Sequence, residues 1–394
     1  MITYQLMRGL LPSAGASASA SASALAHIDL SAMLAALLAA FPALGLLANT
    51  PQDPYYHAEG DVWTHTCMVL QALIESRDYA DANDDERFVL FYAALLHDIA
   101  KPDTTVIDEA TGRIGQPGHS RRGAIDARIL LWRAGVPFAL REAICRIISV
   151  HQLPFFAVGG NKNGQSAQFL IHKLSHELDL RLLCAVAEAD MQGRQYEKKG
   201  DCLVDIELFR EMAREEACYG QPKQFADLHT QLAYFRGAGI TPDYPFYQNP
   251  GSRVMVLSGL PASGKNTWVA KNHPNLAVIS FDDARAELGL KHGANEGAVA
   301  HKAVDDAKAL LRKKAPFIWN ATHLSSQMRK KTLDLLYAYD AQVELVYIEQ
   351  PEALILSRNH QRDTSLSNAG IMKMLFKWEV PLPTEAHVVR YLAA

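Results

Sequence analysis

The feature that most constrains this chain of 394 residues is the stretch RVMVLSGLPASGKNT, residues 253–267. It begins with Val254–Leu257, an apolar run typical of a buried strand, and a glycine-rich loop follows directly. The loop has the spacing Gly259-x-x-x-x-Gly264-Lys265 and leads into a segment of helical character. Glycine is required where a backbone approaches an anion closely or takes a positive φ. This order of elements predicts a site where backbone N–H groups at a helix N-terminus surround a phosphate.

The spacing is the Walker A arrangement, in which the lysine neutralises the outer phosphates of a nucleoside triphosphate. The residues expected to contact the nucleotide are Gly259, Ser263, Gly264, Lys265, Asn266 and Thr267. One position departs from the pattern, because the Ser or Thr whose hydroxyl normally binds Mg²⁺ is replaced by Asn266. An amide oxygen can also hold a metal ion, directly or through water. The sequence therefore predicts binding of ATP or another NTP with Mg²⁺, and leaves the direct Mg²⁺ contact open.

The residues after this loop alternate between strand and helix patterns. Strands are expected at 277–280, 317–319 and 343–348, and helices at 297–314 and 326–339. Such alternation predicts a parallel sheet that binds its ligands at the carboxyl ends of the strands.

Charged residues suited to phosphoryl transfer lie at two places in this part of the chain. Asp282 follows a predicted strand, where a carboxylate can take the proton of an acceptor hydroxyl. Arg285, three residues later, can pair with a phosphate of that acceptor. Arg358 and Arg362 would share one helix face and reach over the triphosphate as lid arginines. The segment Asn320–His323 follows another strand but offers only hydrogen-bonding groups at Asn320 and Thr322.

The first half of the chain has apolar residues at helical spacing from Asp61 to about Arg214. The segment 88–100 is hydrophobic nearly all round, which predicts a buried helix, and it contains the pair His97-Asp98 near its end. A buried carboxylate must be paired or bound to a metal ion. Further candidate ligands lie on or beside other predicted helices: His65, His119, His151 and Asp190.

The order His65, His97-Asp98, Asp190 resembles the H…HD…D signature of the HD-domain metal-dependent phosphohydrolases. The resemblance implies two divalent ions bridged by Asp98. It assigns His65, His97 and Asp190 to one ion, and His119 and His151 to the other. Nitrogen-rich ligands around a bridging carboxylate favour Mn, Fe, Co, Ni or Zn over Mg. Two such ions would lower the pKa of a bridging water and polarise a phosphoester.

Other polar residues near these ligands allow two interpretations. Four basic residues are candidates to contact substrate phosphate, with solvated surface charge as the alternative: Lys101, Arg121, Arg122 and Arg194. His172 and His176 form an i, i+4 pair that could bind metal, but no carboxylate suited to act as a base lies between them. We therefore expect this pair to be structural.

The sequence predicts a multidomain protein of α and α/β class. Its expected parts are a flexible Ala/Ser-rich N-terminus (1–26), an all-α HD domain (27–240), a linker (241–251) and a P-loop kinase domain with a parallel sheet (252–394). The apolar stretch Ala32–Ala48 contains Pro42 and Gly45 and has no flanking basic cluster. We interpret it as a core helix capped near Asp29 or Ser31 and expect no membrane span. Five cysteines without regular spacing favour a reducing, cytoplasmic location.

The second half also resembles the 5′-hydroxyl polynucleotide kinases, through GLPASGK as the P-loop, DDAR as the acidic base with an arginine, and RNHQR as the lid. The whole chain from about residue 40 is similar to the bacterial HD-domain/polynucleotide kinase family of RNA end-healing enzymes. That resemblance implies a 2′,3′-cyclic, 2′ or 3′ phosphoesterase joined to an NTP-dependent 5′-OH kinase. It also implies RNA ends as substrates, with DNA as an alternative, and a separately encoded RNA ligase as a partner. Whether the chain forms a homo-oligomer is left open.

Three other functions fit parts of the pattern. The chain could be a nucleotide phosphohydrolase fused to a nucleoside or sugar kinase. It could also be an NTP-gated hydrolase of a signalling nucleotide, or a binding scaffold with inactive sites. Six intact candidate metal ligands argue against an inactive scaffold. Arg285, which could bind a second phosphate of the acceptor, argues against a nucleoside or sugar as the acceptor.

Overall fold

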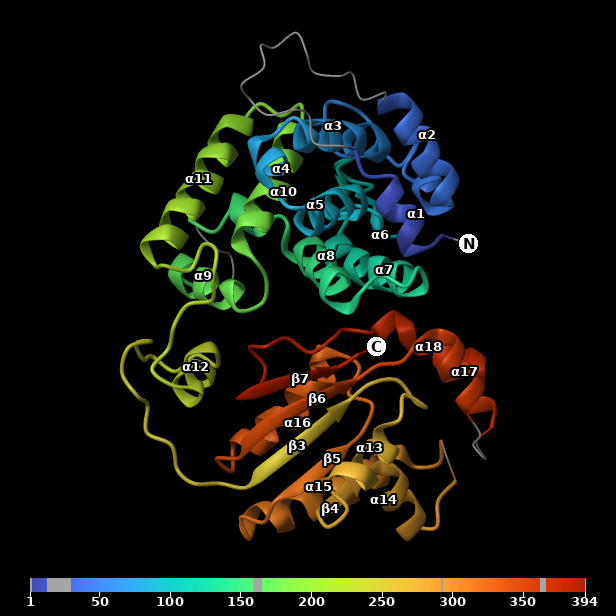
Figure 1. Ribbon diagram of the computed structural model, residues 1–394, viewed down its shortest axis with the longest axis vertical. Helices are drawn as coiled ribbons and strands as arrows, with labels where there is room; N and C mark the ends of the chain where they lie inside the picture. Colours follow the sequence, from blue (N-terminus) through green and yellow to red (C-terminus); the bar gives the residue numbers. More distant parts are fainter. Residues whose placement is uncertain (1, 13–29, 159–164, 292, 362–365, 394) are drawn as a thin grey trace. The chain divides into compact units, whose positions relative to one another are not determined.

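The computed structural model describes residues 2–12, 30–158, 165–291, 293–361 and 366–393. It divides into two compact units, Met1–Lys223 and Gln224–Ala394 (Figure 1). The first unit is built from helices and carries one short hairpin, and the second surrounds a parallel sheet with helices. The predicted fold class, a helical domain followed by a P-loop kinase-like α/β domain, is confirmed.

The helices of the first unit follow closely on one another along the chain. Their bounds are α1 (Tyr4–Gly9), α2 (Leu30–Ala40), η1 (Pro42–Leu46), α3 (Val62–Ile74), α4 (Arg77–Asp81), α5 (Asp84–Leu96), α6 (Lys101–Thr104), α7 (His119–Arg133), α8 (Phe138–Val150), η2 (Leu153–Phe155), α9 (Ala167–Ser175), α10 (Leu180–Gln192) and α11 (Lys199–Glu215). Helices α3, α8 and α10 each pack against α5.

Helix α5 is the centre of this unit. It begins with a capping box, in which the Asn83 side chain accepts from the Glu86 N–H and the Glu86 side chain accepts from the Asn83 N–H. Every residue from Phe88 to Leu96 is buried, as the apolar sequence predicts. The helix ends where His97 caps it. Because every face of the helix is buried from Phe88 to Leu96, its last turn lies in the core, and this places His97-Asp98 inside the unit.

The N-terminal segment differs in part from the prediction of a flexible stretch over residues 1–26. Helix α1 packs into the core through Met7, whose carbonyl accepts a 2.8 Å hydrogen bond from the Tyr92 hydroxyl. The Ala/Ser repeat lies outside the described residues. The predicted helix at 32–48 stops at Ala40, because Pro42 begins a 3₁₀ turn. None of the described helices has both the length and the apolar character needed to cross a bilayer.

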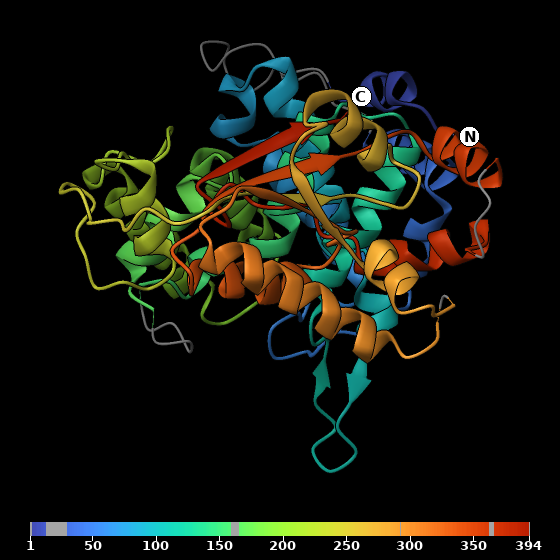
Figure 2. The same ribbon diagram turned by 90° about the horizontal axis from the view of Figure 1, so that it is seen from below.

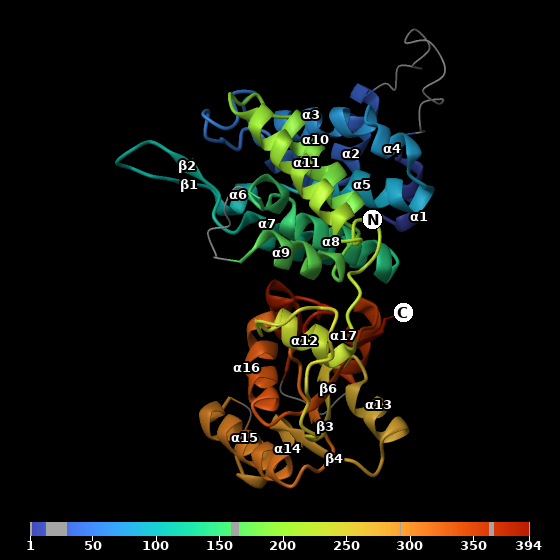
Figure 3. The same cartoon turned by 90° about the vertical axis from the view of Figure 1, so that its left-hand side faces the viewer.

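A hairpin that the sequence did not predict follows α6. Strands β1 (Val106–Ile107) and β2 (Ile114–Gly115) pair antiparallel. The hairpin extends away from the helices of its unit (Figures 2 and 3). Two-residue strands leave too short a pattern to be recognised in a sequence.

The second unit is organised around five parallel strands in the order β4-β5-β3-β6-β7. The bounds of its elements are α12 (Leu228–Phe235), β3 (Arg253–Ser258), α13 (Lys265–Asn272), β4 (Ala277–Ser280), α14 (Phe281–Glu287), α15 (Glu296–Arg312), β5 (Phe317–Asn320), α16 (Ser326–Tyr337), β6 (Gln342–Ile348), α17 (Glu352–His360), α18 (Asn368–Met374), η3 (Leu375–Lys377) and β7 (Val388–Leu392). The edge strand β7 was not predicted. The P-loop strand β3 lies in the middle of the sheet, so its carboxyl end is flanked by β5 and β6.

The boundary between the units lies before the predicted linker. Helix α12, expected in the first domain, belongs to the second unit because its side chains contact that unit. The Arg236 guanidinium, at the end of α12, lies 4.4 Å from the Tyr337 ring centroid and 3.0 Å from Asp334 Oδ1. The Gly- and Pro-rich composition of 241–251 marked irregular structure, but the chain enters the second unit earlier.

A buried arginine joins α16 to the chain that leads into β7. Arg329 is fully buried and forms two hydrogen bonds with Glu385, at 2.6 and 2.8 Å. Its third nitrogen donates to the carbonyls of His323, Leu324 and Glu379. One guanidinium therefore pairs with a carboxylate and donates to three carbonyls.

We expect Arg329→Met to lower the free energy of unfolding by about 3 kcal/mol, because it leaves a largely buried carboxylate without its partner. Urea unfolding of the full chain, followed by tryptophan fluorescence, measures the change. Arg390→Met is the matched control, since Arg390 pairs with Glu344 at an exposed position and should cost about 1 kcal/mol or less. Equal effects of the two substitutions would contradict a structural role for the buried pair.

Candidate functional site

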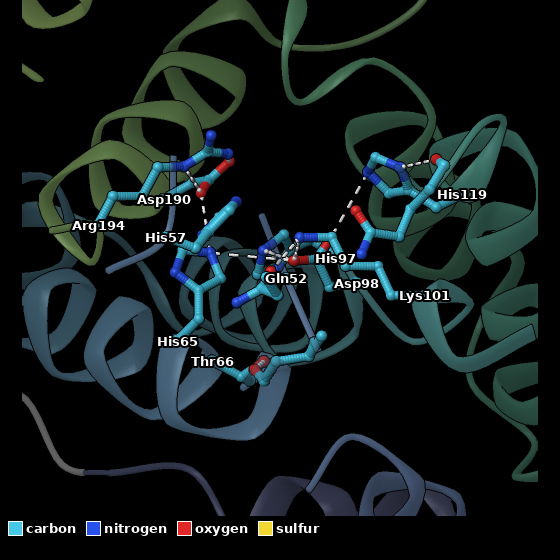
Figure 4. A network of polar contacts seen from close by, with 12 residues as sticks. Gln52, His57, His65, Thr66, His97, Asp98, Lys101, His119, Asp190 and Arg194 are labelled. Carbon is cyan, nitrogen blue, oxygen red and sulfur yellow. Dashed lines mark hydrogen bonds and ion pairs between the residues drawn. The ribbon is translucent and has the colours of Figure 1, made fainter. Parts of the chain in front are cut away.

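Four histidines and two aspartates converge inside the first unit. Three overlapping groups bring their ligand atoms within 4.8 Å of one another: His65, His97 and Asp98; His97, His151 and Asp190; and Asp98, His119 and His151. All six residues are buried. Figure 4 shows side chains from separate helices pointing toward Asp98. The structure thus brings together every residue that the sequence proposed as a metal ligand.

Helix ends and first turns position these side chains. His65 lies in the first turn of α3, which Asp61 caps by accepting from the Thr64 N–H. His97 and His151 cap the C-termini of α5 and α8. His119 begins α7 after Gly118, whose φ of 74° turns the chain into the helix. The ends of several packed helices thus meet at one point.

The tautomers of three histidines follow from a repeated backbone contact. In each, Nδ1 lies 2.7–2.8 Å from the carbonyl oxygen three residues earlier: His97 to Ala94, His119 to Gln116, and His151 to Ile148. A carbonyl oxygen only accepts, so each Nδ1 carries the hydrogen. When the ring is neutral, Nε2 is therefore the acceptor, and in His119 it lies 3.2 Å from the Ser120 hydroxyl. This is the orientation that histidine ligands of metal ions adopt.

The atoms that face the centre form ion-pair contacts with one another but no well-aligned hydrogen bond within the described chain. Nε2 of His97, Nε2 of His151 and both carboxylate oxygens of Asp98 are buried in this state. Asp98 Oδ2 lies 3.0 Å from His97 Nε2 and 2.7 Å from Lys101 Nζ, and Oδ1 lies 3.5 Å from His119 Nε2. Buried acceptors are costly unless something binds them. Neutral imidazoles around a carboxylate therefore fit divalent transition-metal ions.

The charges of the site keep its carboxylates ionised. Burial alone would raise the pKa of Asp98, but the neighbouring His97 and Lys101 hold it well below its usual value. Burial likewise opposes ionisation of Asp190, yet Arg194 and a hydrogen bond from His65 keep its pKa well below normal. Both carboxylates therefore remain anionic in the core of the unit.

Two residues that the sequence did not single out complete the surroundings of His65. Glu59 Oε1 lies 2.9 Å from His65 Nδ1 and 2.8 Å from His57 Nδ1. Burial raises the pKa of the Glu59 carboxyl, but its hydrogen bonds with His57 and His65 outweigh this and lower the pKa overall. Burial lowers the pKa of His57 to about 4. The His-x-Glu spacing just before α3 is the one sequence signal that points to Glu59.

The predicted phosphate-binding side chains occupy different surroundings. Arg194 binds Asp190 through two hydrogen bonds of 2.9 and 2.8 Å, and Lys101 Nζ donates to Gln52 Oε1 at 2.6 Å besides contacting Asp98. Both cations thus line the site and neutralise its carboxylates. Arg121 is exposed at the start of α7, and Arg122 pairs with Asp126 at 2.8 Å.

The pair His172 and His176 has separate partners. His172 Nε2 lies 2.8 Å from Glu216 Oε2, and His176 Nε2 lies 2.7 Å from the Lys223 carbonyl oxygen. The two rings therefore attach α9 to the chain after α11.

The phosphate-binding loop of the second unit leads from β3 into α13. Gly259 has a φ of 146°, and a Cβ there would lie 2.2 Å from the Ile348 carbonyl oxygen. Gly264 has a φ of 101° and begins α13. Lys265 Nζ donates to the carbonyls of Gly259 and Leu260 at 2.9 and 2.8 Å, which holds its ammonium group over the loop.

A cleft of ≈ 1670 Å³ opens at the carboxyl ends of the strands. The predicted nucleotide and acceptor residues that line it are Ser263, Gly264, Lys265, Asn266, Thr267, Asp282, Arg285 and Arg358. Arg358, on α17, has Nη1 3.5 Å from the position of a Cβ on Gly264, so it lies directly beside the loop. Arg362 lies outside the described residues.

Two amides meet where the Mg²⁺ contact is expected. Asn266 Oδ1 accepts a 2.8 Å hydrogen bond from Asn320 Nδ2, at the end of β5. Among the residues that line the cleft, the carboxylates are Asp282 and Asp283, and Asp283 accepts from Ser280 Oγ at 2.6 Å. The loop therefore offers neutral oxygen ligands to a metal ion.

The expected acceptor residues form an ion pair. Asp282 Oδ1 lies 2.7 Å from Arg285 Nη1, and the Asp282 side chain is 87% exposed. Arg285 is mostly buried and also pairs with Glu296 at 3.0 Å. Asp282 is thus accessible from the cleft, whereas Arg285 is already held by two carboxylates.

Comparison with protein-family models divides the chain in the same way as its contacts. Residues 62–190 match the HD domain, and residues 254–381 match an AAA domain. The chain therefore joins an HD domain to a P-loop kinase-like domain. This confirms the two-part organisation predicted from the sequence.

Individual relatives cover only parts of the chain. A multifunctional CCA protein of Halorhodospira halophila is 35% identical over 32% of this chain, and an A-adding tRNA nucleotidyltransferase of Deinococcus radiodurans is 34% identical over 28%. This chain spans 27% of the length of each relative.

Two solved structures resemble part of the chain. A gluconokinase of Sinorhizobium meliloti is 15% identical, with a TM-score of 0.26, over 37% of this chain and 84% of that one. A sugar kinase of Janibacter sp. is 19% identical, with a TM-score of 0.28, over 36% of this chain and 85% of that one.

We expect Glu59→Gln to weaken binding of Mn²⁺ or Co²⁺ by about 10–100-fold, because the neutral amide no longer orients and polarises His65. Competition with a chromophoric chelator measures the affinity directly. Glu109→Gln is the control, since Glu109 is an exposed residue of the β1–β2 hairpin. Unchanged metal affinity in the Glu59 variant would show that this carboxylate does not act through a metal ligand.

Proposed function

We propose that this protein is a bifunctional RNA end-healing enzyme. Its first unit would act as a metal-dependent 2′,3′-cyclic, 2′ or 3′ phosphoesterase, and its second as an NTP-dependent 5′-OH polynucleotide kinase. The observation that carries the proposal is the joining of two sites with complementary chemistry in one chain. One site is a buried cluster of histidines and aspartates, and the other is a phosphate-binding loop in an open cleft with an accessible carboxylate.

RNA chemistry explains why the two activities belong together. Cleavage by transesterification leaves a 2′,3′-cyclic phosphate on one end and a 5′-OH on the other. Repair then requires one hydrolase and one kinase before a separately encoded ligase can join the ends. The name of one relative includes tRNA, which is consistent with an RNA substrate.

For the phosphoesterase, His65, His97, Asp98 and Asp190 with His119 and His151 would hold two divalent ions. When bound, such ions supply a nucleophile from water and polarise the phosphoryl oxygens. Lys101 and Arg194 lie beside the ligand carboxylates, so they hold positive charge next to the place where substrate phosphate would enter.

For the kinase, transfer of the γ-phosphate would proceed in line from NTP to the 5′-OH. Asp282 would orient this hydroxyl and take its proton, because it lines the cleft with an 87% exposed side chain, whereas Asp283 already accepts from the Ser280 hydroxyl. Lys265 and Arg358 lie at the loop, where they would stabilise charge on the transferring group. Arg362 would act with them as a second lid arginine, as the sequence resemblance implies.

One observation favours a second candidate function. Arg285, expected to bind a second phosphate of a polynucleotide acceptor, already pairs with Asp282 and Glu296. A small acceptor without that phosphate would not need to displace these contacts. This supports a nucleotide phosphohydrolase joined to a nucleoside or sugar kinase as the alternative.

The deciding assay uses a short RNA with a 5′-OH and a 2′,3′-cyclic phosphate, labelled ATP, and Mg²⁺ with Mn²⁺ or Ni²⁺. Label gained at the 5′ end and phosphate lost from the 3′ end are the expected results. If neither RNA end changes while nucleosides or free nucleotides react, the alternative function replaces the proposal.

We expect Asp282→Ala to abolish 5′ phosphorylation and spare 3′ dephosphorylation, and Asp98→Ala to have the opposite effect. Each carboxylate lies in its own unit and contacts only the residues of one site, so each loss should exceed about 100-fold. Denaturing gels that follow both ends of the same RNA measure the two rates together. Loss of both activities in either variant would contradict independent sites.

We expect Asn266→Ser to lower the Mg²⁺ concentration needed for half-maximal ATP binding about tenfold, which corresponds to about 1.4 kcal/mol. The substitution replaces an amide tied to Asn320 with the hydroxyl that usually binds Mg²⁺ in such loops. Calorimetric titration of ATP at fixed Mg²⁺ concentrations measures the shift. Asn272→Ser, at the other end of α13, is the matched control, and an equal response from both variants would rule out a metal contact at position 266.

A further inference from the structure

Three tyrosines and an arginine form an exposed aromatic cluster on the first unit. Tyr55, Tyr56 and Tyr196 have ring centroids 4.8–5.7 Å apart, and the Arg113 guanidinium lies 5.7 Å from the centroids of both Tyr55 and Tyr56. We call these four residues the tyrosine platform. Tyr55 and Tyr56 are 47% and 40% exposed. Aromatic rings gathered on a surface, rather than scattered singly, mark binding sites.

Buried contacts hold the platform in place. Asp53 is buried, its Oδ1 accepts from the Tyr55 N–H at 3.0 Å, and its Oδ2 accepts from Arg113 Nε. The Asp53 carbonyl accepts from the Tyr56 N–H at 3.0 Å. One aspartate thus joins the chain before α3 to the β1–β2 hairpin, so two of the rings and the guanidinium are ordered before any ligand binds.

Backbone contacts between two segments hold Tyr196, the third ring, beside the other two. The Ala58 N–H donates to the Gln195 carbonyl at 3.1 Å, and the Gln195 N–H donates to Glu59 Oε2 at 2.8 Å. Tyr196 follows directly in the chain. These paired contacts fix Tyr196 against Tyr55 and Tyr56.

The same segments contact the histidine–aspartate cluster, so the platform adjoins it. Glu59, three residues after Tyr56, lies 2.9 Å from His65 Nδ1. Arg194, two residues before Tyr196, binds both oxygens of Asp190. The segments that carry the tyrosines therefore border the cluster on the side of His65 and Asp190.

The chemistry of the platform fits unpaired nucleobases. The ring planes cross at 88°, 69° and 50°, so the rings meet edge-to-face or tilted and are not stacked on one another. Bases of single-stranded RNA stack on such faces and on guanidinium planes. The single cation is already paired with Asp53, so stacking rather than phosphate attraction would dominate binding.

We infer that the tyrosine platform binds the unpaired bases of the RNA strand whose 3′-terminal phosphate enters the histidine–aspartate cluster. The inference rests on the proposed phosphoesterase function and adds to it the recognition of the strand. It assigns to these tyrosines a role in affinity for a polynucleotide, separate from the hydrolysis of the phosphate.

The test measures binding of the full chain to a hexameric RNA with a 3′ phosphate and a 5′ fluorophore, in EDTA so that no hydrolysis occurs. The fluorophore blocks the 5′ end, so the RNA cannot bind the kinase site as a 5′-OH acceptor. We expect the double variant Tyr55→Ala/Tyr56→Ala to raise Kd about tenfold or more, since stacking carries the affinity. Tyr55→Phe/Tyr56→Phe should bind like the wild type because the rings remain.

Three controls locate the effect. Tyr244→Ala/Tyr247→Ala removes two tyrosines of similar or greater exposure from the second unit and should leave Kd unchanged. An abasic strand should bind the wild type as weakly as the hexamer binds the platform variant. The Tyr55→Ala/Tyr56→Ala variant should lose less affinity for a mononucleotide 3′-phosphate than for the hexamer. An equal loss for both ligands would indicate that the platform binds a free nucleotide and would overturn recognition of the strand.

The outcomes separate this inference from the proposed function. Base binding by the platform would be refuted if the alanine variant bound the hexamer as tightly as the wild type does. It would also be refuted if the substitution lowered the affinity for the hexamer and for the abasic strand equally. Wild-type release of 3′ phosphate from RNA, with an unchanged KM in the alanine variant, would refute the platform alone. No phosphate release by wild type from any RNA end, with the platform variant still losing hexamer affinity, would refute the phosphoesterase and leave base recognition standing.

Discussion

The interaction on which the first unit depends is the burial of Asp98 just after a helix that is buried on all sides from Phe88 to Leu96. Helix α5 fixes the position of the carboxylate, and the histidines around it are turned inward by hydrogen bonds from Nδ1 to backbone carbonyls. These bonds leave Nε2 atoms and carboxylate oxygens as buried acceptors, an arrangement that costs free energy unless a ligand satisfies it. The buried acceptor atoms that cost stability are thus the same atoms that would bind a ligand.

The second unit follows a different physical rule. Its site lies at the carboxyl ends of parallel strands, where a loop with two glycines at positive φ allows the backbone to approach an anion. The central position of β3 places Asn320 of β5 beside the loop, and this explains why Asn266 meets an amide instead of a carboxylate. The two candidate sites are therefore built in opposite ways. One buries charged ligands among histidines, and the other offers backbone donors and flexible cations in an open cleft.

The tyrosine platform illustrates how a binding surface is assembled from residues that have no relation in the sequence. Tyr55 and Tyr56 are adjacent, but Arg113 and Tyr196 come from a hairpin and from the chain after α10. Asp53 and Gln195 join them through hydrogen bonds whose partners lie 60 and 136 positions away. The same contacts reach Glu59 and so continue to His65, which links the surface to the site beside it.

The sequence alone determined the two-part architecture and the phosphate-binding loop, because each depends on local spacing. The set of six histidines and aspartates came from the resemblance to the HD-domain signature. A glycine-rich loop between strand and helix and a His-Asp pair in an apolar helix are readable without neighbours. The tertiary structure decided what depends on distant partners: the assignment of α12 to the second unit, the pairing of Arg285 with Glu296, and the positions of Glu59 and Arg194. Such contacts arise from packing between segments far apart in the chain, and no periodicity in the sequence records which segments will meet.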